Sequence, residues 1–208
     1  MAVHKYMNGE SGLYSVVRRK KAGYTKGTAH KTFDNLLSQD FTATGINQKW
    51  CTDFTYLFLT DGSKRYNCSV LDLHDRSIVS SITDKNITVD LAIRTVKKAL
   101  ESQPVIKGRL ILHSDQGSQY TSKYFTDFCT ETGITQSMSK AGDPYDNAPM
   151  ERYYNTLKSE LIYQHDYHTE DELYSSVEEF AYVTYNRVRP HAYNGYKTPF
   201  EARYTDTK

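Results

Sequence analysis

The sequence predicts an α/β fold, in which one mixed five-stranded sheet is flanked by helices on both faces. Three strand-like segments follow one another with short joints; an amphipathic helix and a further strand come next, with more helices behind. A meander that continues through a helix is typical of mixed sheets that helices cover on both sides. The chain has 208 residues and 38% hydrophobic content, enough to bury one substantial core but hardly two.

Residues 1–46 are expected to form a basic arm or linker, and residues 47–208 the folded core. The arm has weak periodicity, with room for a helical turn or two between Val3 and Val17. Residues 1–50 contain eight Lys or Arg and three Asp or Glu, although the whole chain has a net charge of only +1. The arm is therefore the part that would attract a polyanion, and the alternative is a solvated linker without a dedicated partner.

The first three strands are indicated by aromatic and β-branched residues. The segment from Trp50 to Leu59 is rich in both, and residues 60–63 are a turn signal. Segments 66–73 and 78–82 have the same character and are expected to complete a meander.

The later elements are predicted from changes of period. Apolar residues at i, i+3, i+4, i+7 and i+11 mark one face of a helix over residues 88–102, and a short apolar run at 110–112 indicates a buried strand. The other predicted elements are, in order, a helix over 122–131, a strand over 134–138, a helix over 150–161 and a helix from 173 to about 186.

Cysteine usage and hydropathy narrow the class of protein. Three widely spaced cysteines without a CxxC pair argue against a disulfide framework or a zinc finger, and favour a reducing compartment. His165 and His168 have no cysteine pair near them, so we interpret them as solvated loop residues. No apolar run approaches the roughly 20 residues that span a bilayer, and the N-terminus lacks a signal pattern. We expect a cytoplasmic protein without a membrane partner.

Three carboxylates stand out by their positions in the predicted elements. Asp53 lies in the first strand, Asp115 follows the fourth, and Glu151, about 35 residues later, opens a helix. Adjacent parallel strands would bring the two aspartates together, and the dipole at a helix N-terminus favours a glutamate there. Clustered carboxylates repel one another unless a cation neutralises them, so the pattern asks for a hard divalent metal. Mg²⁺ with phosphate oxygens in its shell points to phosphoryl transfer.

Residues near these carboxylates have simpler interpretations. Asp53 taken alone would more commonly be a surface or turn aspartate, and other acids lie close by. Asp61 belongs to the turn, whereas Asp72 is expected to pair with Arg76. His113 has two interpretations that the sequence leaves open: it binds a metal or phosphate, or it steadies the loop after the fourth strand.

Five short motifs extend this pattern along the chain. They are, in order, WCTDFTYL (50–57), HSDQGSQYTS (113–122), DNAPME (146–151), YNRVRPH (185–191) and TP at 198–199 followed by Glu201. Together they resemble the DDE integrase core of the transposases encoded by insertion sequences of the IS3 type, which are related to retroviral integrases. The resemblance covers roughly residues 36 to 204.

The resemblance implies an RNase H-like fold and a DNA transposase or integrase that cuts and joins strands during DNA integration and recombination. Asp53, Asp115 and Glu151 would be catalytic metal ligands, with two Mg²⁺ or Mn²⁺ ions as cofactor. In a two-metal site one ion activates the attacking oxygen and the other stabilises the leaving oxygen, and we assign the bridging position to Asp53. Water would nick a strand, and the resulting 3′-hydroxyl would join it to new DNA. The implied partners are transposon ends, target DNA and further copies of the chain.

Further DNA contacts are expected around the helix that carries Glu151. Asn155 and Lys158 lie four and seven residues later on the same helical face, and Lys158 is the best candidate for a phosphate contact, its alternative being a solvated lysine. Arg152 stands where this family often has Ser, which would alter local DNA contacts. Other candidates for contact with DNA are Asn147, Tyr120 and Tyr145 near the site, and Arg18, Arg19, Lys20 and Lys21 in the basic arm.

A departure from the family and a turn-prone loop qualify this prediction. Full-length members carry helix-turn-helix segments upstream, and only what resembles the end of that region occurs here, around Glu10 to Lys21, so we expect weakly selective, salt-dependent DNA binding. The turn-prone segment 142–144 is expected to leave Glu151 displaced when no cation is bound. The alternatives are a metal-dependent nuclease of the same fold that does not join strands, and an inactive DNA-binding or dimerisation remnant of a transposon.

Overall fold

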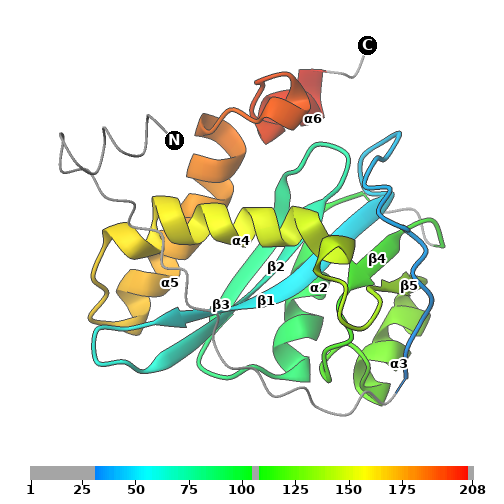
Figure 1. The fold of residues 1–208 in the computed structure, drawn as a ribbon, viewed down its shortest axis with the longest axis horizontal. Helices are drawn as coiled ribbons and strands as arrows, with labels where there is room; N and C mark the ends of the chain where they lie inside the picture. Colours follow the sequence, from blue (N-terminus) through cyan, green and yellow to red (C-terminus); the bar gives the residue numbers. More distant parts are fainter. Residues whose placement is uncertain (1–30, 105–107, 206–208) are drawn as a thin grey trace, which may run out of the picture.

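The computed structural model, described for residues 31–104 and 108–205, contains one five-stranded sheet in the order β3-β2-β1-β4-β5 (Figure 1). Strands β1 and β2, and β2 and β3, pair antiparallel, whereas β4 pairs parallel with both β1 and β5. The predicted mixed sheet and meander are confirmed. The strands are β1 (Lys49–Phe58), β2 (Lys64–Asp72), β3 (Ile78–Asp84), β4 (Ile111–Ser114) and β5 (Thr135–Met138).

Each helix expected within the core is present. Side-chain caps fix their starts: Thr88 accepts a hydrogen bond from the backbone N–H of Leu91, and Thr169 forms a capping box with Glu172. The α-helices are α2 (Val89–Ser102), α3 (Lys123–Thr132), α4 (Ala148–Glu160), α5 (Glu170–Glu179) and α6 (Pro199–Thr205), and a π-helix, η4 (Phe180–Val188), continues α5. The sequence did not predict α6, because it is too short to show a helical period.

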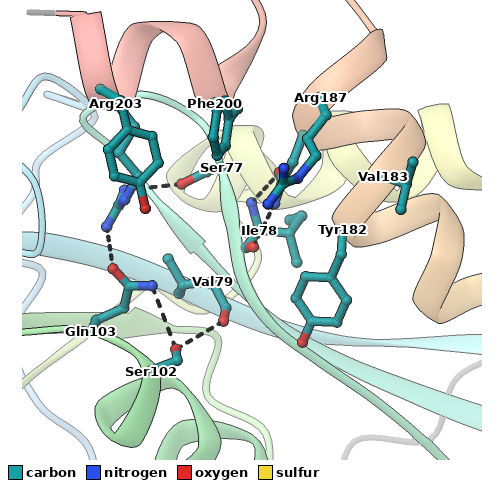
Figure 2. A pocket seen from close by; sticks show the side chains of 12 residues that line it. Ser77, Ile78, Val79, Ser102, Gln103, Tyr182, Val183, Arg187, Phe200 and Arg203 are labelled. Atoms are coloured by element: carbon teal, nitrogen blue, oxygen red, sulfur yellow. Dashed lines mark hydrogen bonds between the residues drawn. The ribbon is translucent and has the colours of Figure 1, made fainter.

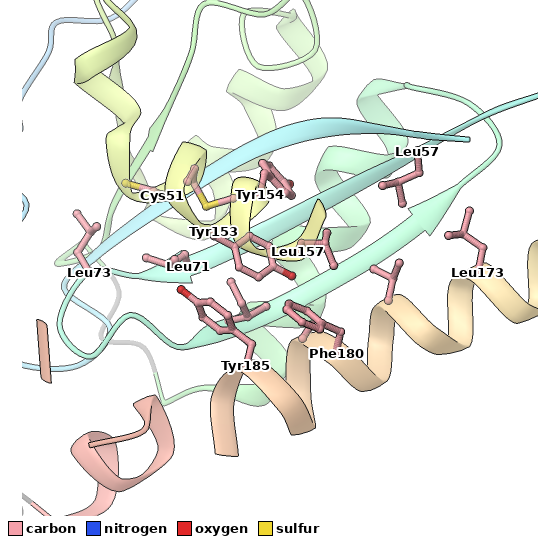
Figure 3. Packing of buried hydrophobic residues seen from close by; sticks show 14 of the residues in the cluster. Cys51, Leu57, Leu71, Leu73, Tyr153, Tyr154, Leu157, Leu173, Phe180 and Tyr185 are labelled. Carbon is pink, nitrogen blue, oxygen red and sulfur yellow. The ribbon is translucent and has the colours of Figure 1, made fainter. Parts of the chain in front are cut away.

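Helices cover both faces of the sheet, as predicted. On one face, α4 and α5 pack on β1 and β2 through a cluster that includes Cys51, Leu57, Tyr153 and Leu173 (Figure 3). On the other face, α2 and α3 pack around Trp50, which is fully buried. Strand side chains alternate between the two faces, so the aromatic and apolar residues of β1 supply both cores.

Residues 31–46 lie against the core. Leu37 is 2% exposed and belongs to the α4 side of the core, with Phe41 packed beside it. The backbone N–H of Leu36 donates to Ser137 Oγ at 2.9 Å. The domain boundary near residue 46 stays a prediction, and the basic residues Arg18, Arg19, Lys20 and Lys21 lie outside the described residues. None of the described helices is both long and apolar enough to cross a bilayer.

The C-terminal helix α6 is fixed to the sheet by one buried arginine. Arg203 Nη1 donates to Asp72 Oδ2 at 3.1 Å and to Asp75 Oδ2 at 2.5 Å. The same guanidinium reaches Ser77 Oγ at 3.0 Å and Gln103 Oε1 at 2.7 Å (Figure 2). These bonds join α6 to the turn between β2 and β3 and to the end of α2, beside a cavity of about 510 Å³.

Asp72 pairs with a different arginine from the one that the sequence predicts. The predicted pair with Arg76 is wrong, because Arg203 occupies the position beside the carboxylate. Arg76 instead donates through Nη2 to the carbonyl of Phe41 at 3.0 Å and stacks on Tyr193. Asp61 does belong to the turn, where it accepts the N–H of Ser63 at 2.7 Å.

Candidate active site

Asp53 in the middle of β1 and Asp115 just after the end of β4 meet across two neighbouring parallel strands. The β1–β4 ladder pairs Cys51 with His113, and each aspartate lies two residues further along its own chain. Both line one cavity of about 100 Å³, together with Gln119. The structure thus brings together two of the three predicted carboxylates.

Backbone N–H groups orient both carboxylates. The N–H of Phe54 donates to Asp53 Oδ1 at 2.7 Å, and the N–H of Gly117 donates to Asp115 Oδ1 at 2.9 Å. A Cβ atom at position 117 would lie 2.8 Å from Asp115 Oδ1, which is closer than side chains approach. Glycine at this position therefore allows the loop to close on the carboxylate.

The charge environment of Asp53 is unfavourable to its ionised form. Burial raises the pKa of Asp53 well above its usual value, and the negative charges of Asp115 and Glu151 raise it further. The N–H of Phe54 and the positive charge of Lys158 act in the opposite direction. Such mutual repulsion is what a bound cation relieves.

Glu151 lies in the first turn of α4, and the helix is fixed directly above β1. Tyr154 Oη donates to the carbonyl of Asp53 at 2.6 Å. Asn147, just before the helix, donates through Nδ2 to the carbonyl of Thr52 at 3.4 Å. Glu151 itself is exposed, and across residues 31–104 and 108–205 no three His, Cys, Asp or Glu side chains are grouped closely enough to hold a metal ion. The expected convergence of all three carboxylates is not seen in this arrangement.

The predicted DNA contacts fall into two groups. Lys158 is half-buried beside Asp53, whose charge raises the pKa of the lysine against the larger lowering by burial. Asn155 and Arg152 are exposed on α4. Asn147, in contrast, is 6% exposed, and the structure directs its amide to the sheet, so we withdraw it as a candidate for DNA contact.

Two further side chains near the site have structural roles. Tyr120 is fully buried with its hydroxyl 3.1 Å from Thr52 Oγ1, so the suggestion that it touches DNA is wrong, whereas Tyr145 is exposed. His113 is also fully buried, with Nδ1 2.8 Å from Ser137 Oγ and Nε2 3.1 Å from the hydroxyl of Ser139. Of its two interpretations, the geometry therefore favours the structural one.

Sequence reasoning missed the residues that build the cavity and hold its helix. Tyr154 lies three residues after Glu151, and its hydroxyl donates to the backbone carbonyl of Asp53, a role that the predicted helix over 150–161 does not reveal. Gln119 and Tyr56 both line the cavity. The one feature of the sequence that points to them is that they lie close along the chain to Asp115 and Asp53.

Family models for the integrase core domain match two overlapping stretches of the chain, residues 43–144 and 132–199. The transposase for insertion sequence element IS904 of Lactococcus lactis is 37% identical over 90% of this chain and 74% of the relative. The chain belongs to the integrase core domain family. Another family member, transposase InsF for insertion sequence IS3A of Escherichia coli, is 34% identical over 80% of this chain and 57% of the relative. The IS3-type resemblance is therefore confirmed, and the chain spans only part of the length of these relatives.

The fold of the family is seen among solved structures. The HTLV-2 integrase catalytic core domain in complex with magnesium (trimeric form) superposes with a TM-score of 0.61 at 19% identity, covering 77% of this chain and 99% of that chain. The predicted RNase H-like fold is thereby confirmed.

Proposed function

We propose that this chain is the catalytic domain of a transposase that cuts DNA strands and joins them to new DNA, with Asp53, Asp115 and Glu151 as the metal-holding residues. The observation that carries the proposal is the meeting of Asp53 and Asp115 in one cavity, beside the helix that presents Glu151. The family supports the activity, because its named relatives are insertion-sequence transposases.

The side chains fit a hard divalent cation. Their donors are carboxylate oxygens, which Mg²⁺ and Mn²⁺ prefer. Burial and then the charges of Asp115 and Glu151 raise the pKa of Asp53, and a cation would relieve the repulsion among these carboxylates and draw Glu151 toward the aspartates. When bound, two such ions supply Lewis-acid chemistry that favours in-line displacement at phosphorus. The magnesium named with the HTLV-2 relative supports this choice of metal.

The chain's own residues orient the reactants. Phe54 and Gly117 hold one oxygen of each aspartate through backbone N–H groups, so both carboxylates keep a fixed direction. Lys158 places a positive charge beside Asp53, where it attracts a DNA phosphate. The proposed partners are transposon-end and target DNA, with contacts from Asn155, Arg152 and the arm residues Arg18, Arg19, Lys20 and Lys21, and further copies of the chain on the DNA.

The test is a pair of assays on oligonucleotides that carry a transposon end, one for nicking and one for joining of a pre-nicked end. Asp53→Asn, Asp115→Asn and Glu151→Gln should each lower the Mg²⁺-dependent rate by at least about 10³-fold and leave DNA binding largely intact, because an amide weakens the ion's shell at nearly constant volume. Asp61→Asn is the matched control and should cut normally. Normal nicking by any triad variant would remove that residue from the site. Nicking without joining would favour the nuclease alternative, and inactivity of the wild type with every metal would favour the remnant.

A further inference from the structure

A second cavity lies on the opposite side of α4 from the two aspartates. It has a volume of about 500 Å³ and is lined from α4 by Arg152 and Thr156, among others. Since helix residues advance about 100° each, Glu151 and Lys158 project on the other side, and the buried stripe that contains Tyr153 lies between. A strand that crosses the exposed face of α4 would therefore contact both sites.

The wall of this cavity is cationic. Three arginines line it, Arg76, Arg152 and Arg189, and no carboxylate is found among its described lining residues. Arg189 is neutralised by Glu160, whose two carboxylate oxygens lie 3.0 and 2.9 Å from its Nε atom. Among the residues that the structure describes, the guanidinium of Arg76 donates to the backbone carbonyl of Phe41 and forms no salt bridge with a carboxylate. The charges of Arg76 and Arg152 are thus left to attract an anion.

Two buried nitrogen atoms in the wall have no hydrogen-bond partner within the described part of the chain. They are Arg76 Nη1 and His191 Nε2. Buried polar atoms are rarely left without a partner, and such atoms in the wall of a cavity indicate a polar ligand. Burial, with the charge of Arg189, lowers the pKa of His191 to about 4, so its ring is neutral at pH 7 and adds hydrogen-bonding capacity without charge.

Aromatic faces complete the wall. The guanidinium of Arg76 stacks on the ring of Tyr193 at 3.8 Å, and Tyr193 is 49% exposed. Tyr196, also in the wall, is 76% exposed. Exposed tyrosine rings and stacked arginines are the groups on which unpaired bases stack.

We propose that this cavity binds one unpaired nucleotide of a DNA strand, with its phosphate at Arg152 and Arg76 and its base against Tyr193. The proposal rests on the proposed function, since it concerns the strand on which the carboxylate site acts. An acidic peptide would satisfy the arginines but would leave the tyrosine faces without a stacking partner. The observations therefore favour a nucleotide.

The experiment measures binding of a single-stranded trinucleotide whose central base is the fluorescent adenine analogue 2-aminopurine, with the full chain and EDTA. Stacking should quench the fluorescence on binding. Arg152→Ala should weaken binding by about tenfold or more, because a hydrogen bond between charged groups is lost. The control is Arg109→Ala, which removes an exposed arginine just before β4 and outside the lining of this cavity.

The tyrosine is tested in the same way. Tyr193→Leu should abolish the quenching of 2-aminopurine fluorescence, whereas Tyr193→Phe should retain it, since stacking needs only the aromatic ring. Tyr124→Leu, which removes an exposed tyrosine of α3, should leave the signal unchanged. Equal affinity and quenching in wild type, Arg152→Ala and Tyr193→Leu would overturn the proposal, and so would displacement of the trinucleotide by an acidic peptide at lower concentration than by unlabelled trinucleotide. Because no metal is present and nothing is cleaved, this result is independent of whether the carboxylate site nicks DNA.

Discussion

Two pairs of aspartates in this fold differ in how their charge is balanced. Asp72 and Asp75, both buried, share the guanidinium of Arg203 at 3.1 and 2.5 Å. Asp53 and Asp115 instead line one cavity, and burial followed by the charge of Asp115 raises the pKa of Asp53.

The difference separates a structural use of carboxylates from a functional one. Burial and Asp75 raise the pKa of Asp72 as well, but Arg203 and two backbone N–H groups oppose that shift from within the fold. At Asp53 the fold supplies one backbone N–H and the charge of Lys158, and Glu151 adds to the repulsion. Arg203 balances the charge of the first pair from within the chain, whereas we propose that a metal ion balances the charge of the second.

The largest expected effect concerns the structural pair. Arg203→Met removes the partner of two buried carboxylates and should lower the free energy of unfolding by about 3–5 kcal/mol. Urea denaturation monitored by circular dichroism measures this change, with Arg109→Met as the control for an exposed arginine. A loss of unfolding free energy below about 1 kcal/mol would contradict the claim that Arg203 balances the charge of Asp72 and Asp75.

A smaller effect is expected where α4 is fixed to the functional pair. Tyr154→Phe removes the hydroxyl that donates to the carbonyl of Asp53 and should cost about 0.5–1.5 kcal/mol of unfolding free energy. If that bond also positions Glu151, the Mg²⁺-dependent rate of DNA nicking should fall at a temperature at which Tyr154→Phe is still fully folded. Tyr145→Phe, an exposed tyrosine, should change neither quantity.

The sequence predicts one of these aspartate pairs well and the other poorly. Asp53 and Asp115 follow from strand periods and turn signals, which are local, and the ladder between β1 and β4 then brings them together. The Arg203 pair depends on a contact across 131 residues and on α6, which is too short to show a period. The inward direction of Asn147 is also a matter of packing, and no pattern in the sequence reveals it.

The pH dependence of stability should carry opposite signs at Asp53 and at a turn aspartate. The pKa of Asp53 is raised in the folded state. Its contribution to the free energy of unfolding is therefore fully present below the pKa of the unfolded chain, near 4, and is lost as pH rises through the pKa of the folded state. In EDTA, Asp53→Asn should therefore be more stable than wild type at pH 8, with the difference shrinking toward pH 4. The pKa of Asp61 is lowered by Ser63, so Asp61→Asn should gain nothing at pH 8. Urea titrations at pH 5, 6.5 and 8 measure both, and equal stability of wild type and Asp53→Asn throughout would contradict the repulsion.

Calorimetric titration of Mn²⁺ and Mg²⁺ into the full chain at pH 7.5 tests most directly whether these carboxylates hold a metal ion. We expect that wild type binds the ion, that Asp53→Asn and Asp115→Asn lose binding, that Glu151→Gln weakens it, and that Asp61→Asn binds as wild type does. The free energy of unfolding of wild type should rise with the ion by about 2.7 kcal/mol at one hundred times the dissociation constant. Equal affinity for Mn²⁺ in wild type, Asp53→Asn and Asp115→Asn would contradict the account, because the ion would then bind elsewhere.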